Sequence, residues 1–171
     1  LASGYTDPAH TTPTAPDDRF VWGSVTKLVT GVAVLRAADA GLLSLSDAAH
    51  AAVDPFFAAW HARNATHFNF SCMADLWGPQ ANEVTVEQLA TMTAGVPDYD
   101  ESGGRSQIDE FRQRSYEQPA IDIGCPELFA VPWEHTGKLE FPPGSRTSYS
   151  SSNFALLGLV LAAAHAKQGQ G

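Results

Sequence analysis

The stretch FVWGSVTKLVTGVAVLRAADAG (residues 20–41) decides the fold of this 171-residue chain. Its apolar residues recur every three or four positions, which predicts a helix from about Ser24 to Ala40, and Gly41 supplies the usual left-handed stop. The repeating apolar positions are Val25, Leu28, Val29, Val32 and Leu35. A serine and a lysine, Ser24 and Lys27, open this helix three residues apart, so that their side chains lie on one face, one turn from each other.

The Ser-x-x-Lys spacing is suited to nucleophilic catalysis. A hydroxyl and an amine placed in this way share a hydrogen bond, and the amine of Lys27 is able to take the proton of Ser24. A free lysine has a pKa of about 10.4 and is protonated at neutral pH, so a role as base requires burial or a partner residue. In the alternative interpretation, Ser24 only caps the helix and Lys27 extends into solvent.

A second motif, PGSRTSYSSSNFALLG (residues 143–158), offers that partner. Tyr149 stands just before a last helix predicted to begin near Ser152, where its phenol is able to shuttle a proton between serine and lysine. In the alternative interpretation, the Pro-Gly pair makes a turn and Tyr149 only packs against its neighbours. The two motifs together predict a site formed by Ser24, Lys27 and Tyr149.

The remaining segments predict short helices and loops rather than a sheet. Residues 42–62 indicate a turn and a short helix interrupted at Pro55, and residues 63–83 are expected to be irregular. A capping box at Thr85 predicts a further short helix. Residues 98–140 are expected to form loops and short helices. Strand signals are scarce throughout, which indicates a helical subdomain separated from its sheet.

Composition excludes several function classes. There are 10 Lys+Arg against 19 Asp+Glu, a formal net charge of −9, which argues against nucleic acid as a partner because phosphates require a basic surface. The apolar runs are shorter than the roughly 18 residues needed to span a bilayer. The six histidines do not follow the spacing of a metal-binding motif, so we expect neither a metal site nor another cofactor.

Two features favour a secreted or lumenal protein. Glycosylation acceptor triplets begin at Asn64 and Asn69, although such triplets are also frequent by chance. Cys72 and Cys125 form either one disulfide or two buried thiols, and the sequence leaves both alternatives open.

Four phrases, in this order, resemble the serine β-lactamase family, in particular the branch of class C β-lactamases, D-alanyl-D-alanine carboxypeptidases and esterases among the penicillin-recognising proteins. FVWGSVTK (residues 20–27) resembles the nucleophile motif, and GLLSLSD (41–47) resembles the G-K-L-x-L-D-D phrase that follows it. VTVEQLATMTAGVPDY (84–99) resembles I-T-I-x-x-L-L-x-H-T-S-G-L-P-D-Y, and residues 143–158 resemble the Tyr-Ser-Asn motif. Ordered together, these motifs are far more specific than any one of them.

The resemblance implies an α+β fold of the β-lactamase/transpeptidase type. Residues 1–171 are then expected to be part of one such domain, with most of its antiparallel sheet missing. We expect a strand end and a loop at 1–20, a helical region carrying the nucleophile at 21–151, and a helix after the tyrosine motif at 152–171.

The resemblance also implies roles for site residues. Ser24 is the expected acylated nucleophile, with its own backbone amide as one oxyanion donor, and Lys27 and Tyr149 jointly are the expected base. Ser151 stands where the family has asparagine and is expected to contact Lys27 or substrate. The expected reaction is hydrolysis of an amide or ester in a small molecule or short peptide: a β-lactam, a D-amino-acid peptide or a small ester.

The chain departs from the family at its third motif, a Lys-Thr-Gly or His-x-Gly on a strand beyond the tyrosine. The similar triplet at residues 135–137 precedes Tyr149, so we interpret it as coincidence. We therefore expect this polypeptide to be a fragment and to be catalytically poor by itself. The alternative is a non-catalytic relative that keeps the fold for a binding or structural role and has a decayed site. Ser151 in place of asparagine favours this alternative.

Overall fold

A computed structural model of the chain describes residues 1–20, 22–100, 124–131 and 134–168, together with positions 109, 113 and 117. Much of the segment 98–140, where loops and short helices are predicted, lies outside these residues. Pairing of extended segments in the described part is limited to two isolated bridges, Tyr5 with Pro13 and Ala48 with Thr85. The helices described are η1 (Gly23–Val25), α1 (Thr26–Asp39), α2 (His50–Arg63), α3 (Met73–Trp77), η2 (Pro79–Glu83), α4 (Val86–Ala90), α6 (Cys125–Phe129) and α7 (Ser151–Gln168).

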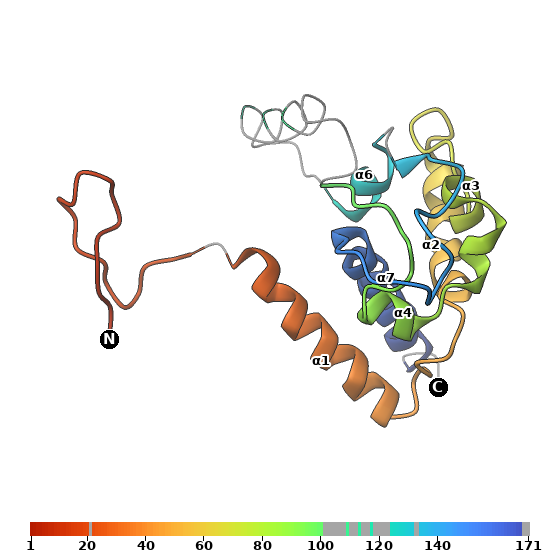
Figure 1. The fold of residues 1–171 in the computed structure, drawn as a ribbon, viewed down its shortest axis with the longest axis horizontal. Coiled ribbons are helices and arrows are strands. Elements are labelled where there is room, and N and C mark those ends of the chain that lie inside the picture. Colours follow the sequence, from red (N-terminus) through yellow and green to blue (C-terminus); the bar gives the residue numbers. More distant parts are fainter. Residues whose placement is uncertain are drawn as a thin grey trace.

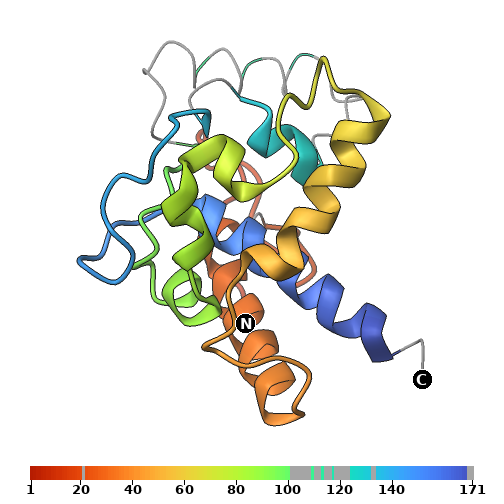
Figure 2. The same cartoon turned by 90° about the vertical axis from the view of Figure 1, so that its right-hand side faces the viewer.

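Helix α7 is the centre of the helical body. It contacts α1, α2, α4 and α6, and Figures 1 and 2 show these helices gathered around it. Leu156, Leu157 and Val160 of α7 are buried among them. A helix with apolar side chains on several faces is stable only when it is surrounded in this way. None of the described helices is long and apolar enough to cross a membrane.

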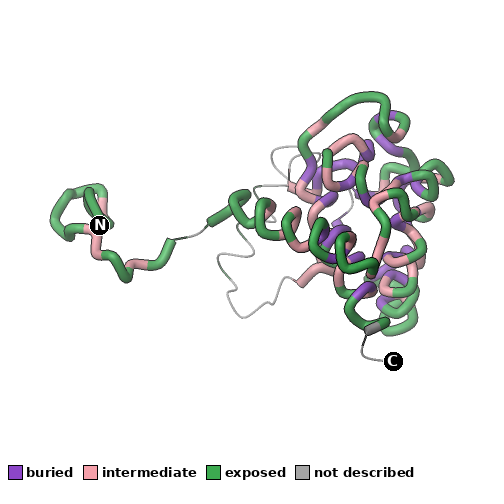
Figure 3. The backbone as a smooth tube through the Cα atoms, turned by 90° about the horizontal axis from the view of Figure 1, so that it is seen from below, coloured by how far each residue is buried: buried purple, intermediate pink, exposed green. Residues whose placement is uncertain are grey.

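Aromatic rings fill the space between α2, α3 and α6. Phe57 is fully buried, and its ring centroid lies 4.9 Å from that of Phe70, 5.2 Å from that of Phe129 and 5.3 Å from that of Trp60. These centroid distances are typical of favourable tilted and edge-to-face pairs. The buried part of the chain is concentrated in this body in Figure 3.

Helix α1 forms where its period predicts it, but the apolar face that reveals it is exposed. Val34 and Ala37 are the buried residues of α1, and the helix packs on α7. The five residues at the repeating apolar positions, Val25, Leu28, Val29, Val32 and Leu35, are 49–71% exposed. Periodicity identifies a helix and its apolar side without identifying what covers that side. In the described chain this face, which we call the α1 outer face, is uncovered.

Residues 1–20 form an arm that extends from the start of α1 away from the helical body (Figure 1). The arm is organised by local bonds: the carboxylate of Asp7 accepts hydrogen bonds from the backbone N–H groups of Thr11 and Thr12 at 3.1 and 2.6 Å. These hydrogen bonds lower the pKa of Asp7. The strand end expected here is represented by the single bridge between Tyr5 and Pro13.

Two local predictions differ from the structure. Helix α2 continues through Pro55 instead of being interrupted there; proline removes one helical hydrogen bond, but the helix still buries Val53, Phe57 and Trp60. Helix α3 lies in a segment that was expected to be irregular. The sequence did not reveal this helix because five residues are too few to display a helical period. A capping box of Cys72 and Asp75 stabilises its start.

The carboxyl group of Glu134 lies within the core. Glu134 is 0% exposed, and burial raises its pKa to about 8. A buried polar group of this kind is costly unless it is hydrogen-bonded. Both oxygens of Glu134 accept hydrogen bonds, from Trp77 and from Ser152.

We expect Leu156→Ala to lower the free energy of unfolding of the 171-residue chain by about 2–5 kcal/mol, because it leaves a cavity in the core. Leu28→Ala is the matched control on the α1 outer face, where Leu28 is 71% exposed, and it should change this free energy by less than about 0.5 kcal/mol. Denaturant titration of both variants measures the difference. Equal losses at the two positions would show that the outer face is covered.

The free energy of unfolding should also depend on pH through Glu134. In the unfolded chain this carboxyl loses its proton near the ordinary value of 4.5, whereas the folded protein retains the proton up to about pH 8. The folded state therefore binds more protons in this window, and stability falls as the pH rises through it. We expect the free energy of unfolding of Glu134→Gln to increase relative to that of wild type between pH 4.5 and about 8. The exposed control Glu83→Gln should show no such relative increase. Unfolding measured at several pH values provides this comparison. Parallel curves for wild type and Glu134→Gln would refute this.

Candidate active site

Ser24 and Lys27 lie at the junction of η1 and α1. The chain enters this junction at Gly23, whose φ of 53° is one that glycine adopts freely. Ser24 lies in η1, and Lys27 is the second residue of α1, so the continuous turn brings their side chains together. Lys27 Nζ donates a hydrogen bond to Ser24 Oγ at 3.2 Å. This is the side-chain pair predicted from the Ser-x-x-Lys spacing.

Tyr149 and Ser151 complete the group from the other end of the chain. The phenol oxygen of Tyr149 and Ser24 Oγ share a hydrogen bond of 2.5 Å across 125 residues of sequence. Lys27 Nζ also donates to Ser151 Oγ at 3.2 Å. The structure therefore brings together all four predicted site residues, and Tyr149 is 52% exposed, so the site is open to solvent.

Hydrogen bonds to the segment 92–97 hold the tyrosine loop in place. The N–H of Ser148 donates to the carbonyl of Met92 at 3.1 Å, and the hydroxyl of Ser150 donates to the carbonyl of Pro97 at 3.0 Å. Tyr149 thus lies between two anchored residues. Gly95 is required for this arrangement, because its φ is 76° and a Cβ there would lie 2.3 Å from the carbonyl oxygen of Phe141.

The electrostatics of the site favour a phenol that gives up its proton. The hydrogen bond from Lys27 is the largest influence lowering the pKa of Tyr149, followed by the hydrogen bond with Ser24. Lys27 Nζ also lies 4.9 Å from the ring centroid of Tyr149 and 5.9 Å from that of Phe154. Aromatic faces attract cations, so both rings help to hold the Lys27 side chain beside Tyr149.

Sequence reasoning missed Phe154 as a neighbour of Lys27. Its signal is the spacing: Phe154 follows Ser151 by three residues on α7, which places both on one face of the helix. The missed contact matters because it adds a second ring to the environment of the ammonium group.

The other features that the sequence singles out lie elsewhere. Cys72 and Cys125 are free thiols, and burial raises the pKa of Cys125 to about 11. Asn64 and Asn69, the starts of the two acceptor triplets, are exposed. The triplet at residues 135–137 packs against α3, with the N–H of Gly137 donating to the carbonyl of Leu76 at 2.8 Å. Within the described residues, no group of three His, Cys, Asp or Glu side chains is placed to hold a metal ion.

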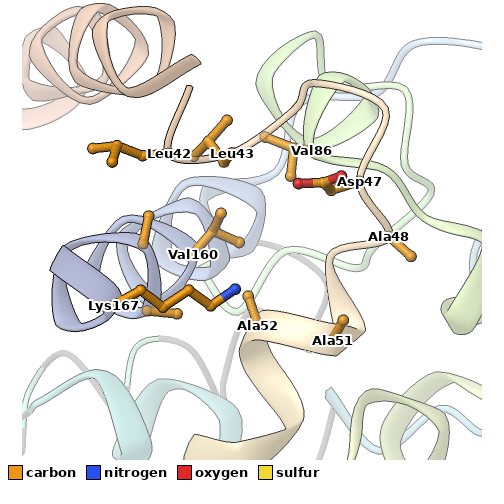
Figure 4. A pocket seen from close by; sticks show the side chains of 11 residues that line it. Leu42, Leu43, Asp47, Ala48, Ala51, Ala52, Val86, Val160 and Lys167 are labelled. Atoms are coloured by element: carbon orange, nitrogen blue, oxygen red, sulfur yellow. The ribbon is translucent and has the colours of Figure 1, made fainter. Parts of the chain in front are cut away.

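A cavity of about 310 Å³ lies at the end of α1 opposite to Ser24 (Figure 4). Its walls are formed by helix α2, helix α7 and the loop that follows α1. Small apolar side chains form much of its wall, with Asp47 and Lys167 at its edges. Asp47 already accepts a hydrogen bond from the N–H of Ser44 at 2.8 Å. Ser24 and its polar partners Lys27, Tyr149 and Ser151 therefore lie at the other end of α1, away from this cavity.

Comparison with known proteins identifies the family. A family model described as Beta-lactamase matches residues 1–170. The chain belongs to this family. Protein flp of Staphylococcus aureus (strain COL) is 25% identical over 158 residues, which cover 92% of this chain and 26% of that protein. This member of the family thus spans about a quarter of the length of its curated relative.

Two solved structures share the fold. A penicillin-binding protein from Bacillus halodurans superposes with a TM-score of 0.65 at 26% identity, covering 97% of this chain and 42% of that one. A D-stereospecific amidohydrolase from Streptomyces sp. superposes with a TM-score of 0.64 at 24% identity, covering 89% and 39%. The β-lactamase/transpeptidase-like fold is thereby established, with this chain corresponding to a largely helical part of it.

Lys27→Met should raise the pKa of Tyr149, because it removes the hydrogen bond that contributes most to lowering it. Titration of the phenolate absorbance measures this, with Tyr149→Phe identifying which part of the signal belongs to Tyr149. An identical Tyr149 titration in wild type and Lys27→Met would contradict the geometry described.

Proposed function

We propose that the protein is a serine hydrolase that cleaves an amide or ester through an acyl-enzyme on Ser24. The observation that carries this proposal is the 2.5 Å hydrogen bond between Ser24 Oγ and the phenol of Tyr149, beside the ammonium of Lys27. A nucleophile within hydrogen-bond reach of a base, which is itself oriented by a third group, is the general arrangement of covalent catalysis. Membership of the β-lactamase family supports the same reaction class.

In the first half of the proposed reaction, Ser24 Oγ forms a bond to the substrate carbonyl carbon and passes its proton to the Tyr149 oxygen. Lys27, which donates to Ser24 and Ser151, stabilises the phenolate that accepts this proton. The bond from the carbonyl carbon to the leaving nitrogen or oxygen then breaks, and the leaving group takes the proton from Tyr149. The product is an ester on Ser24.

In the second half, water attacks the ester carbon while Tyr149 takes a proton from that water. The bond between the carbon and Ser24 Oγ breaks, and Ser24 Oγ takes the proton from Tyr149, which restores the phenolate and releases a carboxylic acid. The substrates proposed are β-lactams, D-amino-acid peptides and small esters. The solved relatives are a penicillin-binding protein and a D-stereospecific amidohydrolase, which supports substrates of this kind.

Ser151 bears on the alternative, a non-catalytic relative with a decayed site. A serine is shorter than the family's asparagine, yet its Oγ lies 3.2 Å from Lys27 Nζ. This contact supports a working site, because the lysine keeps an acceptor at the position.

A secreted or lumenal location is also proposed, supported by the exposed Asn64 and Asn69.

Ser24→Ala should abolish covalent labelling of the full-length gene product by a fluorophosphonate, because the label bonds to the serine oxygen. Ser46→Ala removes an exposed serine hydroxyl elsewhere and should label like wild type. Tyr149→Phe should label about 10²–10⁴-fold more slowly if the phenol is the base. Gel fluorescence and intact mass measure all three.

Absence of an adduct in wild type with fluorophosphonate, fluorescent penicillin and activated ester would overturn the proposed hydrolase and leave the non-catalytic relative. Labelling that persists in Ser24→Ala would overturn the assignment of the nucleophile. A panel of β-lactams, D-amino-acid peptides and esters then separates the substrate classes.

A further inference from the structure

Glu134 joins two helices through its carboxyl group. Its Oε2 accepts a hydrogen bond from the indole Nε1 of Trp77 at 3.1 Å, and its Oε1 accepts one from the hydroxyl of Ser152 at 2.7 Å. Trp77 ends α3, and Ser152 is the second residue of α7. The carboxyl therefore connects the aromatic core to the start of the helix that follows Tyr149.

The carboxyl is a costly choice for stability alone. Glu134 is fully buried, and no lysine, arginine or histidine of the described residues forms an ion pair with it. The charged groups that act on it, Asp98 and Glu140, raise its pKa further. Replacing both partners of a buried hydrogen bond by apolar groups of the same shape can be nearly neutral or stabilising. Its contribution is better explained by geometry: two directional hydrogen bonds specify one arrangement of α7 against α3.

This arrangement reaches the site in one residue. Ser152 follows Ser151, whose oxygen accepts from Lys27. The hydroxyl of Ser152 also accepts a hydrogen bond from the N–H of Tyr99 at 2.9 Å. Tyr99 follows closely after Pro97, whose carbonyl accepts from Ser150. Ser151 thus lies between Ser150 and Ser152, whose hydroxyls both form hydrogen bonds. Hydrogen bonds connect Tyr99 to Ser152 and Ser152 to the buried carboxyl of Glu134.

We propose that Glu134 is a positioning residue, which through Ser152 fixes the start of α7 and so sets Tyr149 and Ser151 against Lys27 and Ser24. Tyr149 is half-exposed, so packing covers only part of its side chain. Its position depends on the anchors around it. The kinetic consequence rests on the proposed function, whereas the effect on Tyr149 does not.

The test uses the full-length gene product with Glu134→Leu, which removes both acceptors, and Glu134→Gln, which keeps one. Glu83→Gln, at an exposed position, is the matched control. We expect the rate constant of acylation by a fluorophosphonate to fall about tenfold or more in Glu134→Leu, since small misplacements of catalytic groups have large effects. Glu134→Gln, which keeps the shape of the side chain and one acceptor, should lose less than Glu134→Leu, and Glu83→Gln should equal wild type.

The second readout needs no activity. Loosening the start of α7 weakens the hydrogen bonds that lower the pKa of Tyr149, so its phenol should titrate at higher pH in Glu134→Leu than in wild type. If the leucine variant does not fold, Ser152→Ala cuts the same link from α7 and should act in the same direction. In a double-mutant cycle, Glu134→Gln and Ser152→Ala should be non-additive, as expected for residues in one network.

Folded Glu134 variants with wild-type acylation and an unchanged Tyr149 titration would overturn the positioning role while leaving the proposed function intact. A wild type that no acyl probe labels would overturn the proposed function, and the Tyr149 titration alone would then decide the role of Glu134. Additive effects of Glu134→Gln and Ser152→Ala would also overturn it.

Discussion

The hydrogen bond between Ser24 and Tyr149 spans 125 residues of sequence, and the rest of the structure serves to make it. Ser24 is carried by the start of α1, and Tyr149 immediately precedes α7. Because α1 packs directly on α7, the two side chains meet only when these helices have one relative position. The aromatic core, the bonds from residues 92–97 to the tyrosine loop and the buried carboxyl of Glu134 all act on that position.

Local sequence signals predicted much of this arrangement. Helix α1 was predictable from its period, α4 from the capping box at Thr85, and the site from two motifs whose residues each have a chemical role. Such signals are readable because they depend on neighbours within one helical turn. The convergence of Ser24, Lys27, Tyr149 and Ser151 was predictable only because the motifs were interpreted together.

Features decided by tertiary packing were not predictable. The burial of Glu134 depends on Trp77 and Ser152, which are distant in sequence, so no local pattern marks it. Pro55 is tolerated because α2 buries Val53 before it and Phe57 and Trp60 after it. Helix α3 is too short to display a period. The exposure of the α1 outer face depends on which side of α1 packs on α7, and periodicity does not reveal this. Each of these outcomes rests on long-range contacts that a single sequence does not display.

The site and the α1 outer face share one helix. Val25 and Leu28, both exposed, adjoin Ser24 and Lys27, so any segment or partner that covers this face also borders the site. The chain corresponds to about two-fifths of each solved relative. Access of substrate to Ser24 is therefore best studied in the full-length gene product.

A crystal structure of the full-length gene product after reaction with a fluorophosphonate tests the central claim most directly. The account predicts a bond from phosphorus to Ser24 Oγ, with the Tyr149 phenol and the Lys27 amine both within hydrogen-bond distance of that oxygen. A phosphonate bonded to a different residue, or a Tyr149 phenol turned away from the adduct, would contradict it.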